Sequence, residues 1–165
     1  MDIEKTTNIK PKGFKAHLFT KEYESKYSEE QIWKWLNNPN TFIKSQVWPF
    51  KVEFLRSADQ AHDFVTGVLN NHHGPGLSLA GKIGEITPHY RDLEYFYGSY
   101  ALSFRLVRPF RLEFWTDDKG DKRIVRVQLS CFVHNGFFNI WSWSQNIFWK
   151  RFGKKMNQGI KKLLK

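Results

Sequence analysis

The sequence has little cysteine and no long apolar run, and each shortage excludes a class of protein. Cys131 is the single cysteine among 165 residues, so no internal disulfide bond can form and a reducing compartment fits best. The opening stretch MDIEKTTNIKPKGFK lacks the apolar segment of a secretory signal. No apolar run is long enough to span a bilayer, and the most apolar stretch, GFFNIWSWSQNIFW, is interrupted by polar residues. These absences predict a soluble cytoplasmic protein.

Acidic residues are missing from the end of the chain. From Lys122 onward there are ten Lys or Arg residues and no Asp or Glu. Residues 1–121 therefore hold 16 residues of each sign and are neutral as a whole, although the chain carries a net charge of +10. A partner that responds to this charge would meet it on the last part of the chain.

Aromatic residues, in contrast, are abundant. Hydrophobic residues make up 41% of the chain and aromatic residues 17%, with 15 Phe, 7 Trp and 6 Tyr. This composition argues against disorder and indicates a core, or a cavity, walled by rings. The length fits a single domain, which we expect at residues 13–165 after a flexible polar leader at 1–12.

Alternation of apolar and polar residues predicts a series of strands. In GFKAHLF, residues 13–19, Phe14, Ala16 and Leu18 fall on one face, and PFKVEFL at 49–55 alternates in the same way. Four more strand-like runs follow at 77–86, 91–102, 108–116 and 123–133. The DDKGDK stretch between the last two suits a hairpin turn, with Gly120 free to adopt positive φ. Consecutive strands with short links predict an antiparallel sheet.

Two short helices are predicted after the first strand. Ser28 is a suitable N-cap, and Gln31, three residues later, completes a capping box. A second short helix is expected at 41–46. The stretch 57–71 is interpreted as a short helix or an irregular insert, and HHGPG at 72–76 as a turn.

The final stretch, residues 146–165, has the spacing of an amphipathic helix with its lysines opposite an apolar stripe. The stripe consists of Phe148, Phe152, Met156, Ile160, Leu163 and Leu164. Such a helix could lie on an anionic membrane, or it could cover a sheet and show its lysines to water. Gly153 and Gly159 fall on or beside the stripe and favour the second interpretation, because small residues allow close approach to a sheet.

The order of these elements resembles the START/Bet v 1-like superfamily, also called SRPBCC, with its polyketide cyclase and lipid-transport branches. The resemblance covers residues 13–165 and is one of order and pattern, without a catalytic signature. It rests on YSEEQIWKWLNNPNTF as the helix pair, LAGKIGEITPHYRDLEYFYG and RPFRLEFW as central strands, and FWKRFGKKMNQGIKKLL as the closing helix. It implies an α+β helix-grip fold, in which a curved antiparallel β-sheet wraps around a long C-terminal helix. The glycine-rich G-x-G-G-x-G loop of the plant-allergen branch is missing, so nothing specific to that branch is carried over.

The resemblance also implies an apolar cavity between the sheet and the last helix. We expect seven residues to line it, namely Tyr95, Tyr97, Phe110, Leu112, Leu129, Phe152 and Met156. The leading prediction is that the chain binds or carries a small hydrophobic or amphipathic molecule there. Two alternatives stay open: a cyclase- or hydrolase-like enzyme that uses polar residues at the cavity mouth, and peripheral binding to an anionic membrane or nucleic acid through the basic C-terminal helix.

Candidates for catalysis are weak. A polar group around Pro88 could do acid–base work, yet it equally suits a polar loop with ion pairs at strand ends, which we favour. The group comprises Glu85, His89, Arg91, Asp92 and Glu94. Cys131 has apolar neighbours on the inward face of its strand and is assigned to packing. No catalytic motif is identified.

No metal or other cofactor is expected, and two kinds of macromolecular partner are weighed. His72 and His73 are adjacent, and adjacent side chains on an extended chain point apart, so we assign them to a solvated turn. A set of aromatic residues interleaved with arginines could stack nucleic-acid bases or line a ligand cavity. The aromatic residues are Tyr95, Tyr97, Tyr100, Trp115, Trp141 and Trp143, and the arginines are Arg91, Arg105, Arg108 and Arg111. Because the fold favours the cavity, we expect no stable nucleic-acid complex and leave open a weak contact with an anionic membrane.

Overall fold

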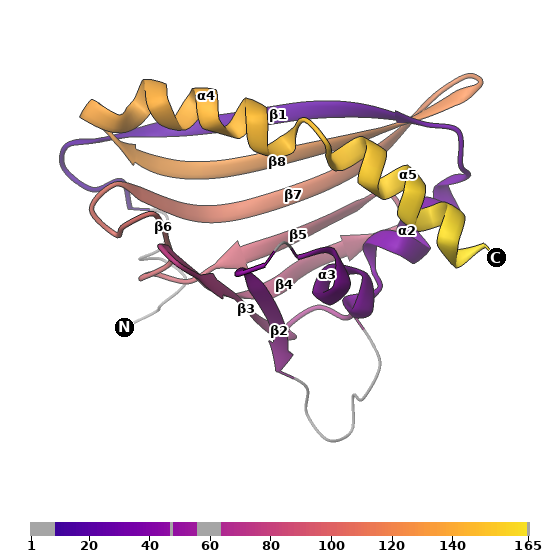
Figure 1. Cartoon of the computed structure of the whole chain (residues 1–165), viewed down its shortest axis with the longest axis horizontal. Coiled ribbons are helices and arrows are strands. Elements are labelled where there is room, and N and C mark those ends of the chain that lie inside the picture. Colours follow the sequence, from indigo (N-terminus) through magenta and orange to yellow (C-terminus); the bar gives the residue numbers. More distant parts are fainter. Residues whose placement is uncertain (1–8, 47, 56–63, 165) are drawn as a thin grey trace.

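The strands of the computed structural model form one curved antiparallel sheet (Figure 1). The structure describes residues 9–46, 48–55 and 64–164. Its strands are β1 (Phe14–Ser25), β2 (Lys51–Leu55), β3 (Leu69–Gly74), β4 (Leu77–Thr87), β5 (Tyr90–Tyr95), β6 (Tyr100–Ala101), β7 (Val107–Lys119) and β8 (Lys122–His134). The strand order is β1-β8-β7-β5-β4-β3-β2, and β6 pairs with β4 and β7.

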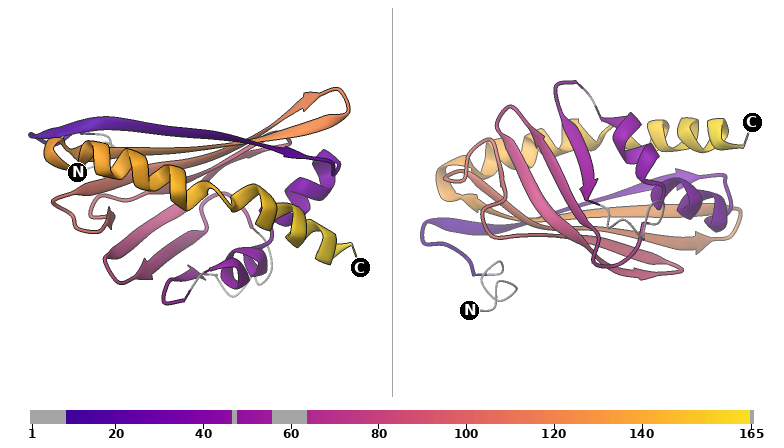
Figure 2. Two further views of the ribbon diagram at one scale, coloured as in Figure 1. Left: turned by 45° about the horizontal axis from the view of Figure 1, so that its top comes forward. Right: turned by 90° about the horizontal axis from the view of Figure 1, so that it is seen from below.

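The helices gather on one face of this sheet (Figures 1 and 2). They are α2 (Glu29–Leu36), α3 (Pro39–Ser45), the 3-10 turn η1 (Asn135–Phe137), α4 (Phe138–Trp149) and α5 (Phe152–Leu163). The helix α4 contacts β1 and β8, and α5 contacts β1 and α2. The predicted antiparallel sheet, short helix pair and C-terminal helix are therefore confirmed. None of the helices within the described ranges is long and apolar enough to cross a membrane.

Local signals in the sequence account for several of these elements. The Ser28 hydroxyl accepts a hydrogen bond from the Gln31 backbone N–H at 3.3 Å, and the Gln31 side chain accepts one from the Ser28 N–H at 3.0 Å. This is the predicted capping box. Gly120 has φ of 65°, and β7 and β8 continue to Lys119 and Lys122, so the predicted hairpin turn is a tight one.

The strand β1 turns an unexpected face toward the core. Phe19 and Tyr23 are buried against the helices, whereas Leu18 is 62% exposed on the other side. Phe19 pairs with Leu129 of β8, and Tyr23 with Val125, which are also core residues. The alternation at Phe14, Ala16 and Leu18 therefore marks the outward face of a strand that is longer than predicted.

The turn predicted at residues 72–76 is wrong in part. His72 and His73 belong to β3, which pairs with β2 on one side and β4 on the other. The turn is confined to Pro75 and Gly76. Histidine is a weak strand former, so pairing with both neighbours, and not local propensity, decides this segment. Most of the helix or insert predicted at 57–71 lies outside the described residues.

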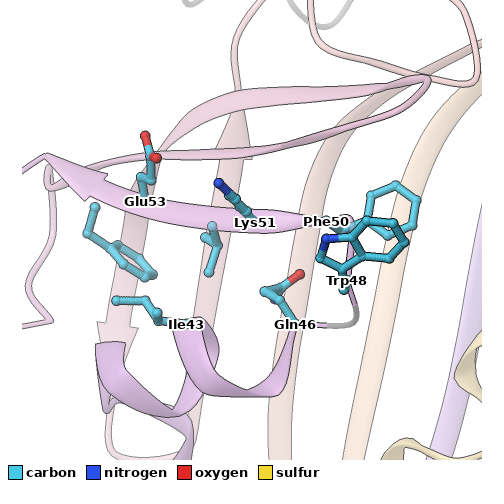
Figure 3. Close-up of a pocket in the computed structure, with 8 residues that line it drawn as sticks. Ile43, Gln46, Trp48, Phe50, Lys51 and Glu53 are labelled. Atoms are coloured by element: carbon cyan, nitrogen blue, oxygen red, sulfur yellow. The ribbon is translucent and has the colours of Figure 1, made fainter.

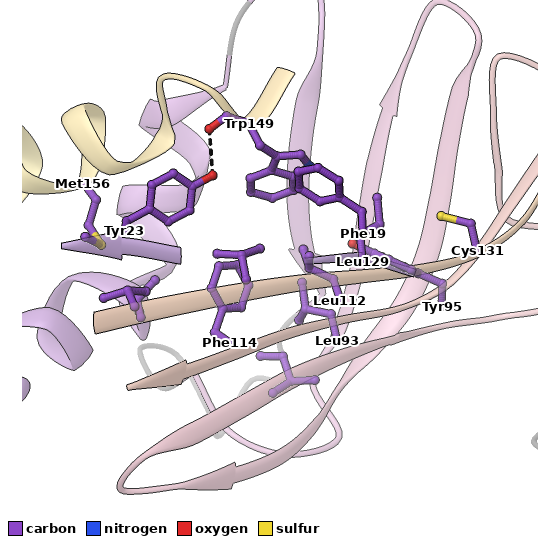
Figure 4. Packing of buried hydrophobic residues seen from close by; sticks show 14 of the residues in the cluster. Phe19, Tyr23, Leu93, Tyr95, Leu112, Phe114, Leu129, Cys131, Trp149 and Met156 are labelled. Atoms are coloured by element: carbon purple, nitrogen blue, oxygen red, sulfur yellow. Dashed lines mark hydrogen bonds between the residues drawn. The ribbon is translucent and has the colours of Figure 1, made fainter. Parts of the chain in front are cut away.

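The C-terminal helix is divided between Trp149 and Phe152, and the division has a visible cause. The Tyr23 hydroxyl donates a 2.7 Å hydrogen bond to the carbonyl of Trp149 (Figure 4). A side chain that captures a helical carbonyl in this way interrupts the hydrogen-bond ladder. The predicted stripe is buried at Met156 and Ile160, but Phe148, Leu163 and Leu164 are exposed, which corrects their assignment to the covered face.

The glycine at position 153 allows α5 to approach β1 closely. A Cβ atom there would lie 2.6 Å from Cδ1 and 3.1 Å from Cβ of Tyr23. A methyl group does not fit at these distances, because the hydrogen bond from Tyr23 to Trp149 holds the tyrosine ring in place. The expected role of Gly153 in close packing is therefore confirmed.

Candidate ligand site

Five of the seven predicted lining residues lie between the sheet and the helices. Tyr95, Leu112, Leu129 and Met156 are buried in the core (Figure 4). Phe152 is partly buried and packs against this core. Whether they contact a ligand stays a prediction.

The other two residues, Tyr97 and Phe110, lie elsewhere, so their predicted place in the interior is wrong. A register shift between Pro109 and Arg111 turns Phe110 to the outer face, where its ring lies 4.8 Å from that of Phe132. Tyr97 follows the end of β5, is 61% exposed and packs on Phe104. Both line a small outer hollow of about 20 Å³.

The space beneath the start of α5 is occupied by aromatic rings. The centroid of Phe152 lies 5.2 Å from Tyr23 and 5.4 Å from Trp149. Trp35 and Phe114 each lie 6.0 Å from the same ring. Rings in contact at these distances leave no room for a ligand among them, directly beneath the start of α5.

A hollow of about 550 Å³ opens between α3 and β2 (Figure 3). Its lining includes Ile43 and Gln46 near α3, Trp48 and Phe50 before β2, and Phe54 in β2. Trp48 is highly exposed. The hollow is open to solvent, and the charged side chains of Lys51 and Glu53 lie beside its aromatic and aliphatic wall.

A cluster of three phenylalanine rings lies between this hollow and Arg91. Phe54 lines the hollow, and its ring lies 6.1 Å from Phe42 and 5.5 Å from Phe64. The same two rings stack on the guanidinium group of Arg91, at 4.9 Å and 4.6 Å. The hollow and the buried polar groups behind it are therefore neighbouring parts of one region.

Those polar groups share the inner face of the sheet because of the strand register. Val52 of β2 pairs with His72 of β3, and Phe54 pairs with Asn70. Asn70 in turn pairs with Gly81 of β4, which pairs with Tyr95 of β5. Residues directly opposite in an antiparallel sheet point to the same side. Asn70, His72 and Tyr95 consequently face the helices.

Several buried atoms of this group have no hydrogen-bond partner among the described residues. They are both amide atoms of Asn70, Nε2 of His72, and Nε and Nη2 of Arg91. Because nearly all buried polar groups in proteins are paired, these atoms are available to a water molecule or to a polar group of a ligand. We refer to Asn70, His72, Arg91 and Tyr95 as the interior polar group.

Arg91 is the most unusual member of the interior polar group. Its side chain is fully buried, and its charge lies 4.7 Å from the ring of Phe114, in addition to Phe42 and Phe64. Nη1 donates to the carbonyl of Leu36, but no carboxylate within the described ranges forms an ion pair with Arg91. Burial lowers the pKa of Arg91, yet a guanidinium group remains protonated at neutral pH. A charge in this position attracts an anionic group.

His72 is held neutral by the same surroundings. Burial, followed by the charges of Arg91 and His73, lowers the pKa of His72 to about 4. Its ring meets Tyr95 edge-on at 6.3 Å and Phe42 at 6.5 Å. At neutral pH the imidazole can therefore both donate and accept a hydrogen bond without adding a second positive charge beside Arg91.

This shift makes the stability of the protein depend on pH. Below its unfolded pKa of 6.5, His72 binds a proton in the unfolded state before it does so in the folded state, so stability falls as the pH falls toward about 4. Between about pH 7.5 and about pH 5, the loss from His72 alone should be about 2 kcal/mol. Urea titrations of the parent and of His72→Phe would measure it.

The exposed His134 provides the control for this experiment. His72→Phe should flatten the pH dependence, leaving the smaller contribution of His17, whose pKa burial also lowers. His134→Phe should leave the dependence unchanged. If the free energy of unfolding fell with pH to the same extent in the parent and in His72→Phe, the buried imidazole would not titrate as the geometry implies.

Three of the five polar residues around Pro88, namely His89, Asp92 and Glu94, lie beside a side chain with which they can form an ion pair. Asp92 is buried and pairs with Arg111 at 2.6 Å, on the face opposite Arg91. Glu94 pairs with Lys82 at 3.3 Å, and His89 lies 2.6 Å from Glu29. The ion pairs predicted for this cluster are therefore confirmed at Asp92 and Glu94, whereas Arg91 points into the core and the prediction is wrong for it. Cys131 is fully buried, and burial raises the pKa of its thiol, as expected for a packing residue.

Asn70 and His72 were missed as site residues because their segment was interpreted partly as a turn. The pattern Leu69-Asn-Asn-His-His does alternate in space, with Asn70 and His72 on one face of β3. A continuous polar strand, however, resembles a loop when only the sequence is considered. Arg91 shares one face of β5 with Leu93 and Tyr95, so alternation alone would place it inward, but its charge favours a position in a solvated loop.

Comparisons with known proteins agree with this fold. No protein-family model matches the sequence, and no curated protein matches it significantly. Norcoclaurine synthase from Thalictrum flavum, in complex with dopamine and hydroxybenzaldehyde, has a TM-score of 0.65 at 15% identity, covering 92% of this chain and 88% of that one. The Aha1 dimer from Colwellia psychrerythraea has a TM-score of 0.58 at 14% identity, covering 87% of this chain and 98% of that one. Ara h 8.0201 has a TM-score of 0.54 at 13% identity, covering 90% and 97%.

These similarities show the class of fold and nothing finer. The chain has the START/Bet v 1-like helix-grip fold that its sequence resembles. At such identities the substrates of the neighbours describe the neighbours alone.

Proposed function

We propose that the protein binds or carries a small amphipathic molecule whose anionic end meets Arg91. The observation that carries this proposal is the fully buried guanidinium group, enclosed by Phe42, Phe64 and Phe114, two of whose nitrogen atoms have no hydrogen-bond partner among the residues that the structure describes. A carboxylate, sulfonate or phosphate group would pair with those nitrogens. The hollow between α3 and β2 lies on the other side of Phe54 and would admit the molecule.

The apolar part of the ligand would lie among the rings that separate the hollow from Arg91. Phe42, Phe54 and Phe64 are arranged around one another at centroid distances of 5.5 to 6.1 Å. Rings with this spacing provide broad apolar walls. Neutral His72 and the Asn70 amide would orient the polar end, because each offers a hydrogen bond without a competing charge. Norcoclaurine synthase binds small aromatic molecules on this fold, which supports the size of ligand proposed.

Two fluorescent probes of similar shape test the proposal directly. Anilinonaphthalene sulfonate carries an anionic group, and phenylnaphthylamine is its uncharged relative. Arg91→Met should weaken binding of the anionic probe by about tenfold to a hundredfold, since a charged hydrogen bond contributes about 1.5–3 kcal/mol. Binding of the uncharged probe should change little. Fluorescence titration of both probes would measure the effect.

The exposed Arg105 supplies a matched control, because Arg105→Met removes the same charge from the surface. It should leave both probes unaffected. Circular dichroism of Arg91→Met should show a folded protein, because methionine fills a similar apolar space among Phe42, Phe64 and Phe114. Equal affinity of Arg91→Met and the parent for the anionic probe would refute the proposed anchor.

Native mass spectrometry of freshly purified protein should in addition detect a retained acidic molecule.

A further inference from the structure

The helix α4 presents apolar side chains to both the core and the solvent. Trp141, Gln145 and Trp149 form its buried side. Four large apolar residues lie on the exposed side, separated along the chain by three, four and one positions. Each of their side chains is between 53% and 71% exposed. They are Ile140, Trp143, Ile147 and Phe148, which we call the α4 patch. A helix that only covers a sheet needs a single apolar side, so packing does not explain this patch.

Basic residues flank the α4 patch at both ends of the helix. Lys15 of β1 lies over the ring of Phe138 at the start of α4, with its ammonium group 5.8 Å from the ring centre. Lys150 and Arg151 follow directly after the last residue of α4, and Lys154 and Lys155 are exposed in the first turns of α5. No acidic residue occurs in the sequence after Asp121.

The acidic side chains of the adjacent strand do not neutralise this charge. Glu22 and Glu24 of β1 point to the outer face of the sheet, because Tyr23 between them points inward. Glu22 lies 3.0 Å from Arg126, and Glu24 pairs with Lys122. The α4 patch therefore has cations at its ends and no carboxylate on its own helix.

We propose that the α4 patch docks on a membrane surface that contains anionic lipids. Tryptophan, isoleucine and phenylalanine would enter the boundary between headgroups and acyl chains, and Lys150, Arg151, Lys154 and Lys155 would meet the lipid phosphates and carboxylates. This combination of apolar side chains and basic residues is the pattern of helices that lie in a membrane interface. Docking is independent of the proposed ligand and of Arg91.

Charge complementarity selects this partner over two others. A symmetric contact between two copies would bring the same lysine-rich surface to both sides of the interface, where like charges repel. Nucleic acid would satisfy the lysines and could stack on Trp143 and Phe148, but it would leave the aliphatic side chains of Ile140 and Ile147 without an apolar partner. An anionic bilayer provides negative charge and an apolar layer at the same boundary.

Vesicle flotation of the full chain tests the proposal. The protein should float with phosphatidylcholine vesicles that contain phosphatidylserine, and not with phosphatidylcholine alone, and binding should weaken as salt is added. Trp143→Ser with Ile147→Ser should reduce the partition coefficient at least about tenfold. The matched pair Leu18→Ser with Tyr97→Ser changes two side chains of similar exposure away from α4 and should leave it unaltered.

A second pair of variants tests the charge. Lys150→Gln, Lys154→Gln and Lys155→Gln together should weaken binding about a hundredfold, since each basic residue near an anionic surface strengthens binding about fivefold. Changing three other exposed lysines to glutamine removes the same amount of charge away from α4 and should weaken vesicle binding much less. These lysines are Lys10, Lys34 and Lys44. Arg91→Met should float like the parent, which separates docking from ligand binding.

Each opposing result would overturn the docking proposal. These results are full binding by the Trp143/Ile147 variant, absence of parent binding to anionic vesicles at low salt, and binding to single-stranded nucleic acid in place of vesicles. A dimer of the parent in sedimentation, converted to a monomer by the same double change, would assign the α4 patch to a second copy of the chain instead.

Discussion

Replacing Phe152 with alanine should lower the free energy of unfolding by about 3–5 kcal/mol. The ring stands at the start of α5 and meets the rings of Tyr23, Trp35, Phe114 and Trp149 at 5.2 to 6.0 Å. Removing it would leave a gap beneath the point where α5 joins the sheet, and four rigid rings cannot collapse to fill it. Urea denaturation followed by tryptophan fluorescence and circular dichroism would measure the loss.

Lys154, two positions along and exposed, provides the comparison on the same helix. Lys154→Ala should change stability by no more than about 0.5 kcal/mol, as expected for a free surface position. If both variants showed the same small effect, α5 would not be docked in solution as the contacts of Phe152 require.

The second large effect is expected at Asp92, where alanine should cost about 3 kcal/mol. The carboxylate is fully buried and accepts hydrogen bonds from Arg111 Nε at 2.6 Å and from the Glu85 N–H at 2.7 Å. The Glu85 bond fixes the register shift between Ile83 and Ile86 of β4. This loss of stability is at the low end of the range for removing one partner of a buried ion pair. The reason is that Arg111, left without its partner, is partly exposed and can be hydrated by water.

Glu94, on the same outward face of β5, is the control for Asp92. It pairs with Lys82, but its side chain is 42% exposed. Glu94→Ala should therefore change stability by less than about 1 kcal/mol. Equal losses at Asp92 and Glu94 in the same denaturation experiment would show that burial does not distinguish the two carboxylates.

The fold could be predicted from the sequence because its signals are local and repeated. The capping box at Ser28, the hairpin at Gly120 and the alternation along β7 and β8 each depend on neighbouring residues. Their order then limits the topologies that short connections allow. The interruption of the C-terminal helix could not be predicted, since it depends on the Tyr23 hydroxyl, 126 positions away from Trp149.

The candidate site was harder to predict than the fold, because it depends on the face of the sheet to which each side chain points and not on the order of the strands. One register shift beside Phe110 moves that ring from the interior to the outer face. Pairing of β3 with β2 and β4 turns His72 inward, although its segment resembles a loop. Arg91 and Asp92 are neighbours in the sequence, yet they lie on opposite faces of β5 with different partners. Such outcomes are fixed by tertiary contacts.

The pairing of β1 with β8 has a consequence for how the protein folds. Thr20 and Gln128, which are joined by a hydrogen bond, lie 108 positions apart, and the two strands pair along their whole length. Contacts of such long range require a large loop to close before any stabilisation is gained, which slows folding relative to helical proteins of similar size. During synthesis, β1 emerges from the ribosome long before β8. Its core residues Phe19 and Tyr23 therefore lack their strand partners until almost the entire sheet has been made.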